Sequence, residues 1–155
     1  MYNSSYDSQL EKLSNLKWLP WVGDNYPELP PSNKILIIGE SHYQNAQDDM
    51  SGQENKLYTR QVLHDMAIDG NQYNSPFFSN ILKVFFPNKE ITRDERYTFW
   101  NNLAFYNFVQ RPMGDKRKRP DKKDFELGLC ITVMLGQVGR MMLGHFPAAI
   151  IQDFC

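Results

Sequence analysis

The feature that most constrains the fold is a pair of short apolar runs that stand far apart in the chain, ILII at residues 35–38 and LAFYNFVQ at residues 103–110. The first run is β-branched at three of four positions and has turn-like flanks, which predicts a strand buried on both faces. The second is dense in aromatic residues and predicts another buried strand. Helical patterns separate the two runs, at residues 57–68, 75–85 and 92–102. So long a connection requires parallel pairing, which places the chain in the α/β class.

The expected architecture is a three-layer sandwich in which helices flank a short central parallel sheet. The 155 residues suit a single domain, residues 1–155. Within it, residues 1–33 read as a packed, irregular lead-in that contains Trp18 and Trp21. Residues 128–155 form an atypical tail with four glycines and almost no charge. The phenylalanines between the two runs are expected in the core: Phe77, Phe78, Phe85 and Phe86.

Charge and cysteine content exclude several classes of protein. The formal net charge of −1 gives no general attraction to polyanions, so any binding of nucleic acid needs a local basic patch. Two cysteines are too few for a disulfide framework or a four-thiolate cluster, and they favour a reducing compartment. The first ten residues have no signal-peptide pattern, and no apolar run reaches the roughly 20 residues of a membrane span. We therefore expect a cytoplasmic protein with no membrane partner.

Polar residues follow both predicted strands. Gly39 to Tyr43, with the sequence GESHY, come directly after the first strand, and Asn107 lies near the end of the second. In open parallel sheets, ligands bind beyond the carboxyl ends of the strands. Gly39 permits a close backbone approach. Asn107 can pair with a group that presents one donor and one acceptor, such as a nucleobase edge.

Each of these residues also has a purely structural interpretation. Glu40 or Ser41 can cap a helix, and Asn107 can satisfy buried backbone groups. As functional groups, Glu40 can hold or activate a water molecule, His42 titrates near neutral pH, and Tyr43 offers a ring as a pocket wall. The clustering of all these residues at two strand ends favours a binding or catalytic site.

A basic segment begins beside Asn107. Residues 111–123, RPMGDKRKRPDKK, hold seven basic and two acidic residues, a local charge of +5 that leaves −6 for the rest of the chain. A solvated loop is one interpretation. A loop that follows phosphates beside a base-reading pocket is the other. The candidate phosphate-binding residues are Arg111, Lys116, Arg117, Lys118 and Arg119.

Two of these segments resemble motifs of the uracil-DNA glycosylase superfamily. IIGESHY, at residues 37–43, is similar to its first motif, a strand followed by Gly-Gln-Asp-Pro-Tyr or Gly-Glu-Ala-Pro-Gly. FYNFVQRPMGDKRKRP, at residues 105–120, resembles a later strand whose terminal Asn precedes an Arg/Pro-rich loop. The resemblance covers roughly residues 18–125 and includes the Trp/Pro/Tyr-rich lead-in. It implies the superfamily fold, in a complete or shortened form, and hydrolysis of the N-glycosidic bond of a damaged base in DNA.

The resemblance also implies individual roles. Glu40 falls where one branch of the superfamily positions the attacking water, and Ser41 stands where the classical enzymes keep a catalytic Asp. His42 replaces the usual proline. Tyr43 matches the tyrosine that excludes the 5-methyl group of thymine, and Asn107 matches the asparagine that reads a flipped uracil. Two cysteines cannot hold an iron–sulfur cluster, so no cofactor is expected.

The tail departs from the superfamily pattern. Superfamily members continue into further strands and a His-containing motif, whereas His145 in GHFP follows no convincing strand and is assigned no catalytic role. One interpretation is a shortened or frameshifted ending after Leu127. The other is a compact variant whose last strand, at residues 148–154, completes a three-stranded sheet.

Two other functions compete with the glycosylase. The same surface suits a non-catalytic module that binds nucleic acid or a nucleotide. GESHY is also similar to the Gly-Glu-x-His signature of the erythromycin-esterase and haem-uptake clan, in which Glu40 and His42 would form the catalytic or metal-binding pair. No second carboxylate–histidine pair is evident for a metal site.

Overall fold

A small mixed sheet forms the centre of the molecule. The computed structural model describes residues 2–43, 53–70, 75–114 and 119–138. Its sheet has the strand order β1-β3-β2, where the strands are β1 (Trp21–Val22), β2 (Leu36–Gly39) and β3 (Ala104–Asn107). The predicted parallel pairing of β2 with β3 is confirmed, with Leu36 opposite Ala104 and Gly39 opposite Asn107.

The prediction of a purely parallel sheet is wrong, because β1 joins β3 in the antiparallel sense. The two residues of β1 lie between Pro20 and Gly23, so the strand is too short to produce an alternating pattern in the sequence. Its side chains are nevertheless fully buried, since Trp21 and Val22 each have no exposed surface. The proline-rich lead-in therefore supplies the third strand.

The predicted helices are present with shifted ends. Helix α2 continues into the wider π-helical segment η4, which ends at Gly70 with a φ of 64°. Thr92 and Glu95 form the predicted capping box of α4. The helical elements are α1 (Asp7–Leu10), η1 (Tyr26–Glu28), η2 (Pro31–Asn33), α2 (Tyr58–Leu63), η4 (His64–Asp69), α3 (Pro76–Phe85), α4 (Arg93–Asn101) and α5 (Lys122–Val138).

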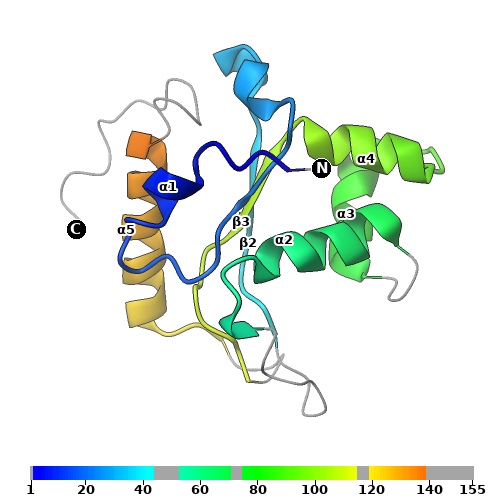
Figure 1. Cartoon of the computed structure of the whole chain (residues 1–155). Helices are drawn as coiled ribbons and strands as arrows, with labels where there is room; N and C mark the ends of the chain where they lie inside the picture. The colour runs from blue at the N-terminus through cyan, green and yellow to red at the C-terminus, as the bar shows by residue number, and fades with distance from the viewer. Residues whose placement is uncertain (1, 44–52, 71–74, 115–118, 139–155) are drawn as a thin grey trace.

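Helices lie on both sides of the sheet, with α1 and α5 on one side and α2, α3 and α4 on the other (Figure 1). Each side has its own apolar core. On the α5 side, Ile131 and Leu135 pack in a cluster with Leu10, Val22 and Tyr106. Residues 128–135, in the first part of the atypical tail, thus contribute to the core. Residues 139–155, including the predicted strand at 148–154, lie outside the described residues.

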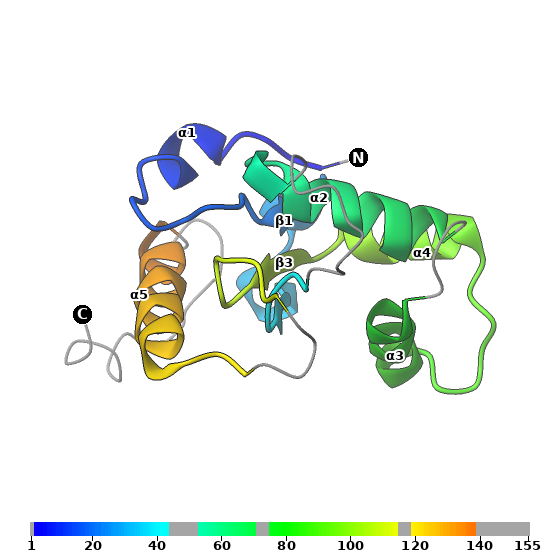
Figure 2. The same ribbon diagram turned by 90° about the horizontal axis from the view of Figure 1, so that it is seen from below.

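The opposite core is rich in aromatic side chains. Trp21, Trp100 and Phe105 are buried there beside Phe78, as expected for Phe78. The expectation is wrong for Phe77 and Phe85, which are exposed. Both lie on α3, which covers only part of this side of the sheet (Figure 2). These two rings are therefore available at the surface.

Strand β2 is an edge strand, and the expectation that both of its faces are buried is wrong. It pairs with β3 alone and lies at the margin of the sheet that faces away from α1 (Figure 2). Ile38 consequently remains 47% exposed, and Ile35 just before the strand is also exposed. Among the described helices, none is long and apolar enough to span a bilayer.

Candidate functional site

Hydrogen bonds join the two polar segments beyond the carboxyl ends of β2 and β3. The Phe108 N–H donates to the Gly39 carbonyl (2.9 Å) and the Val109 N–H to the Glu40 carbonyl (2.8 Å). Further on, the Met113 N–H donates to the His42 carbonyl (2.9 Å). The structure therefore brings together residues 39–43 and 107–113, as expected for the ends of adjacent parallel strands.

Gly39 and Asn107 are in direct contact at the centre of this region. A Cβ atom at position 39 would lie 2.3 Å from Asn107 Oδ1 and 2.9 Å from Phe105 Cζ, so only glycine fits here. Asn107 is only 4% exposed. Among the described residues, none makes a hydrogen bond to its side-chain amide. The amide atoms of Asn107 are not among the fully enclosed side-chain atoms that lack a partner, so they reach solvent and have capacity for a ligand.

The turn that follows Asn107 is held by Gln110. The Gln110 Nε2 group donates to the Asn107 carbonyl (2.6 Å), and Gln110 Oε1 accepts the Trp18 N–H (2.9 Å). The side chain of Gln110 is buried, so both bonds are protected from water. The lead-in thereby fixes the backbone that carries Asn107.

Phe77 is a candidate site residue that sequence reasoning missed. Its ring is 45% exposed and lies edge-to-face with the ring of Phe105, with centroids 6.1 Å apart. Phe105 in turn touches the space beside Gly39. The exposed ring is thus available to stack on a planar ligand near Asn107. Phe77 and Phe78 are adjacent and identical, so the sequence does not show that Phe78 is buried and Phe77 is exposed.

Glu40 is held by two side chains. The Tyr43 hydroxyl donates to Glu40 Oε2, and Arg119 Nη1 lies 3.4 Å from Glu40 Oε1. The hydrogen bond to Glu40 is the main cause of a raised Tyr43 pKa, burial adds to it, and the charge of Arg119 acts in the opposite sense. The Glu40 side chain is 37% exposed, so it also meets solvent.

His42 lies in a packed environment. Its ring is edge-to-face with Trp18 (4.8 Å between centroids) and with Tyr58 (4.7 Å), and its Nε2 lies 2.9 Å from Thr59 Oγ1. Burial lowers the pKa of His42 to about 4, so the ring is neutral at pH 7. These contacts favour a packing role for His42. They do not place the His42 ring where it could exchange a proton with Glu40.

Two further predicted residues take part in local anchoring. The Ser41 hydroxyl donates to the Arg111 carbonyl (2.7 Å). The Arg111 guanidinium makes a two-pronged ion pair with Asp124, with Nε–Oδ1 and Nη2–Oδ2 distances of 2.6 and 2.5 Å. Asp124 also forms reciprocal backbone bonds with Asp121 that cap α5. Arg111 thus anchors α5 to the site and is already engaged.

The remainder of the basic segment is described in part. Arg119 is 84% exposed, with Glu40 as its partner. Lys116, Arg117 and Lys118 lie outside the described residues. Within the described parts of the chain, no three His, Cys, Asp or Glu side chains gather as a metal site would require.

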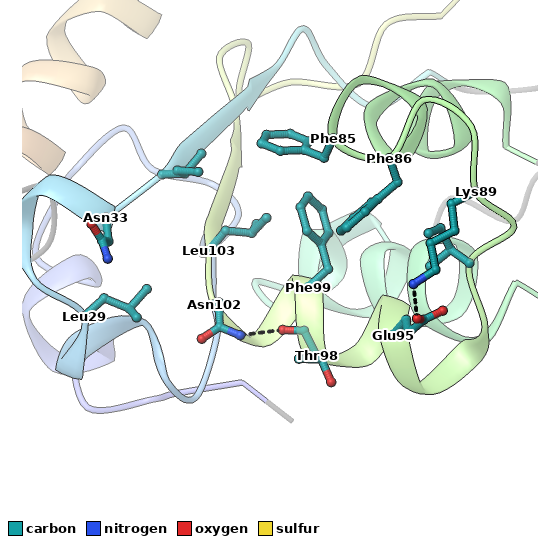
Figure 3. Close-up of a pocket in the computed structure, with 12 residues that line it drawn as sticks. Leu29, Asn33, Phe85, Phe86, Lys89, Glu95, Thr98, Phe99, Asn102 and Leu103 are labelled. Carbon is teal, nitrogen blue, oxygen red and sulfur yellow. Dashed lines mark hydrogen bonds and ion pairs between the residues drawn. The ribbon is translucent and has the colours of Figure 1, made fainter.

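A further pocket among the described residues lies away from these strand ends. It has a volume of about 450 Å³ and is bordered by Ile35, just before β2, and Leu103, just before β3 (Figure 3). It therefore opens at the amino ends of these strands, whereas Gly39 and Asn107 lie at the carboxyl ends. Apolar side chains, including Phe85 and Phe99, form most of its wall, and a Lys89–Glu95 ion pair lies at one side (Figure 3).

The fold and the site define the chain as a mixed helix-and-sheet protein with a polar site at the carboxyl ends of two parallel strands. Comparisons with protein-family models, with curated proteins and with solved structures find no match to this chain. The functional assignment consequently depends on the geometry of Gly39, Glu40, Asn107 and the side chains around them.

Proposed function

We propose that the chain binds a nucleobase displaced from nucleic acid and hydrolyses its N-glycosidic bond, as a protein of the uracil-DNA glycosylase type. The helices on both sides of the sheet suit the three-layer architecture of that superfamily. The observation that carries the proposal is the Asn107 amide, which lies against Gly39 with no hydrogen bond from the described residues. An amide donor and acceptor held in this way match the edge of uracil.

Each neighbouring side chain has a role in this proposal. The exposed ring of Phe77 stacks on the face of the base, and Tyr43 limits the space beside it. Glu40 orients a water molecule toward the sugar carbon that carries the base. The water oxygen bonds to that carbon as the bond from carbon to base breaks, and Glu40 accepts the proton of the water. The Asn107 amide N–H donates to a base carbonyl and so stabilises the negative charge of the departing base.

A non-catalytic nucleic-acid or nucleotide-binding module is the second candidate. The observation that favours it is the position of His42, whose buried ring packs against Trp18 and Tyr58 with its Nε2 beside Thr59 Oγ1. Both carboxylate oxygens of Glu40 also have a partner already, in Tyr43 and Arg119. The binding surface is the same in both proposals, and the difference lies in the chemistry of Glu40.

The Gly-Glu-x-His alternative has less support. It requires Glu40 and His42 to act on one metal or substrate, yet Glu40 contacts Tyr43 and Arg119 while His42 contacts Thr59. The two side chains thus have separate partners.

The test uses the full chain and two fluorescein-labelled single-stranded oligonucleotides that differ only in one uracil or thymine. Anisotropy measures binding, and alkaline cleavage reveals base release. Asn107→Ala is expected to weaken binding of the uracil strand at least about tenfold, because a buried amide pair is lost. Glu40→Gln is expected to retain binding and lose base release.

Asn33→Ala is the matched control, since Asn33 is an exposed asparagine at the opposite end of β2. It should leave binding unchanged. Binding without base release by the unaltered chain would support the module instead of the enzyme. Equal affinity of the unaltered chain and the Asn107→Ala variant would remove the basis of both proposals.

A further inference from the structure

Arg119 and Glu40 form the most exposed contact of the candidate site. The Arg119 side chain is 84% exposed, and its Nη1 lies 3.4 Å from Glu40 Oε1. The second carboxylate oxygen accepts the Tyr43 hydroxyl. In the free protein, therefore, each oxygen of Glu40 already has a partner.

The contact with Arg119 is the easier of the two to replace. A solvent-exposed ion pair of this kind contributes little to stability, because water and salt screen its charges. A guanidinium binds a phosphate through two parallel hydrogen bonds, which is stronger than a single contact at 3.4 Å. A phosphate that arrives beside Glu40 can therefore take over Arg119.

We propose that Arg119 exchanges Glu40 for a backbone phosphate when nucleic acid binds, and that this exchange releases Glu40 Oε1 for a water molecule. The proposal rests on the proposed function, because it assigns a switch to the same site. Arg119 is then a positioning residue that acts through Glu40. No proton or electron moves in the exchange, which replaces one ion pair by another.

The exchange has a consequence for the class of substrate. A nucleic acid or a nucleotide brings the phosphate that removes Arg119 from Glu40, whereas a free nucleoside does not. The site should thus act faster on phosphate-bearing substrates than on the free nucleoside, by up to about fivefold, because the ion pair that the phosphate replaces is weak. This selectivity would arise even if the pocket at Asn107 bound the base of the nucleotide and the base of the free nucleoside equally well.

A double-mutant cycle in binding tests the exchange, with the full chain and the labelled uracil oligonucleotide. If Glu40 competes with the phosphate for Arg119, Glu40→Gln should tighten binding about threefold, and Arg119→Gln should weaken it. The gain from Glu40→Gln should disappear in the Arg119→Gln background. Arg119→Lys should restore only part of the affinity and of the gain, because a lysine keeps the charge but cannot make the two parallel hydrogen bonds to a phosphate.

Two controls separate the exchange of Arg119 from a change in folding and from a change in base binding. Thermal unfolding should be unchanged by Arg119→Gln, since the side chain is almost fully exposed. Binding of 2′-deoxyuridine should be insensitive to Arg119→Gln.

The outcomes distinguish the two proposals. If the oligonucleotide binds and Glu40→Gln weakens binding or leaves it unchanged, the ion pair persists in the complex and the exchange is wrong, while the proposed function stands. If neither the oligonucleotide nor the nucleoside binds, both proposals fail.

Discussion

Gly39 and Asn107 are register partners at the ends of β2 and β3, and the amide oxygen of Asn107 occupies the space that a Cβ of residue 39 would need. This contact fixes the position of the one buried side chain that is best suited to read a base. Because of this contact, even the single methyl group added by Gly39→Ala should disturb the position of the Asn107 side chain.

Gly39→Ala is the first prediction. The new methyl group would lie 2.3 Å from Asn107 Oδ1 and 2.9 Å from a ring atom of Phe105. We expect a loss of about 1–3 kcal/mol in unfolding free energy from overpacking, and a loss of affinity for the uracil oligonucleotide. Urea unfolding and anisotropy measure the two effects. Gly114→Ala is the control, because a Cβ there meets nothing within 4 Å. Equal effects of the two variants would contradict the prediction.

The second prediction concerns pH. The pKa of His42 is lowered to about 4 in the folded protein, whereas an unfolded His titrates near about 6.5. Between these values the unfolded state binds the extra proton, so the unfolding free energy falls as the pH is lowered from about 6.5 to about 4. The total contribution of His42 is up to about 3 kcal/mol.

Urea unfolding of the unaltered chain and of His42→Gln across this range measures the effect. The variant should show a flatter pH dependence. Asn33→Ala is the control, since Asn33 is exposed and carries no titratable group, so its substitution should preserve the slope. An unchanged slope in His42→Gln would show that another group is responsible.

The third prediction concerns the ion pair of Arg111 and Asp124. Their mutual hydrogen bonds raise the pKa of Arg111 and lower the pKa of Asp124. Because the Asp124 pKa is lowered, its contribution to stability is present above about pH 4 and disappears as the pH falls further. Asp124→Asn should cost about 1–2 kcal/mol at pH 7, as a cap of α5 is also weakened.

A double-mutant cycle with Arg111→Gln isolates the pair from the cap. The coupling free energy should be clearly above zero at pH 7 and should fall as the pH is lowered below about 4. A coupling free energy that does not change with pH would show that charge is not its origin.

The fourth prediction concerns the exposed edge of the sheet. Ile38 is 47% exposed on a strand with one neighbour, and such edges promote association between chains. Ile38→Lys should reduce concentration-dependent light scattering and change the unfolding free energy by less than about 1 kcal/mol. Ile131→Lys, in the buried core beside α5, should by contrast unfold the chain. Unchanged scattering in Ile38→Lys would place any association elsewhere.

The local sequence pattern was sufficient for some parts of the fold and not for others. The parallel pairing of β2 and β3 could be predicted, because two apolar runs joined by several helices leave few other arrangements. Strand β1 could not, because two residues carry no periodicity. The exposure of Ile38 could not be predicted either, because it depends on which strands lie beside β2. The four apolar residues at 35–38 do not show the order of the strands in the sheet.

The candidate site divides in the same way. The meeting of residues 39–43 with residues 107–113 follows from their position after adjacent strands. The surroundings of His42 do not, because Trp18 and Tyr58 reach it from distant parts of the chain. The engagement of Arg111 by Asp124 depends on where α5 begins, which a run of charges does not reveal.

The bond between Gln110 and the backbone of Trp18 has a practical implication for anyone who shortens or tags this chain. The same Gln110 supports the carbonyl of Asn107, so trimming the first twenty residues would disturb the site rim while leaving every predicted ligand-binding residue in place. Deletion of these residues would then reduce binding in the same way as a substitution in the site itself.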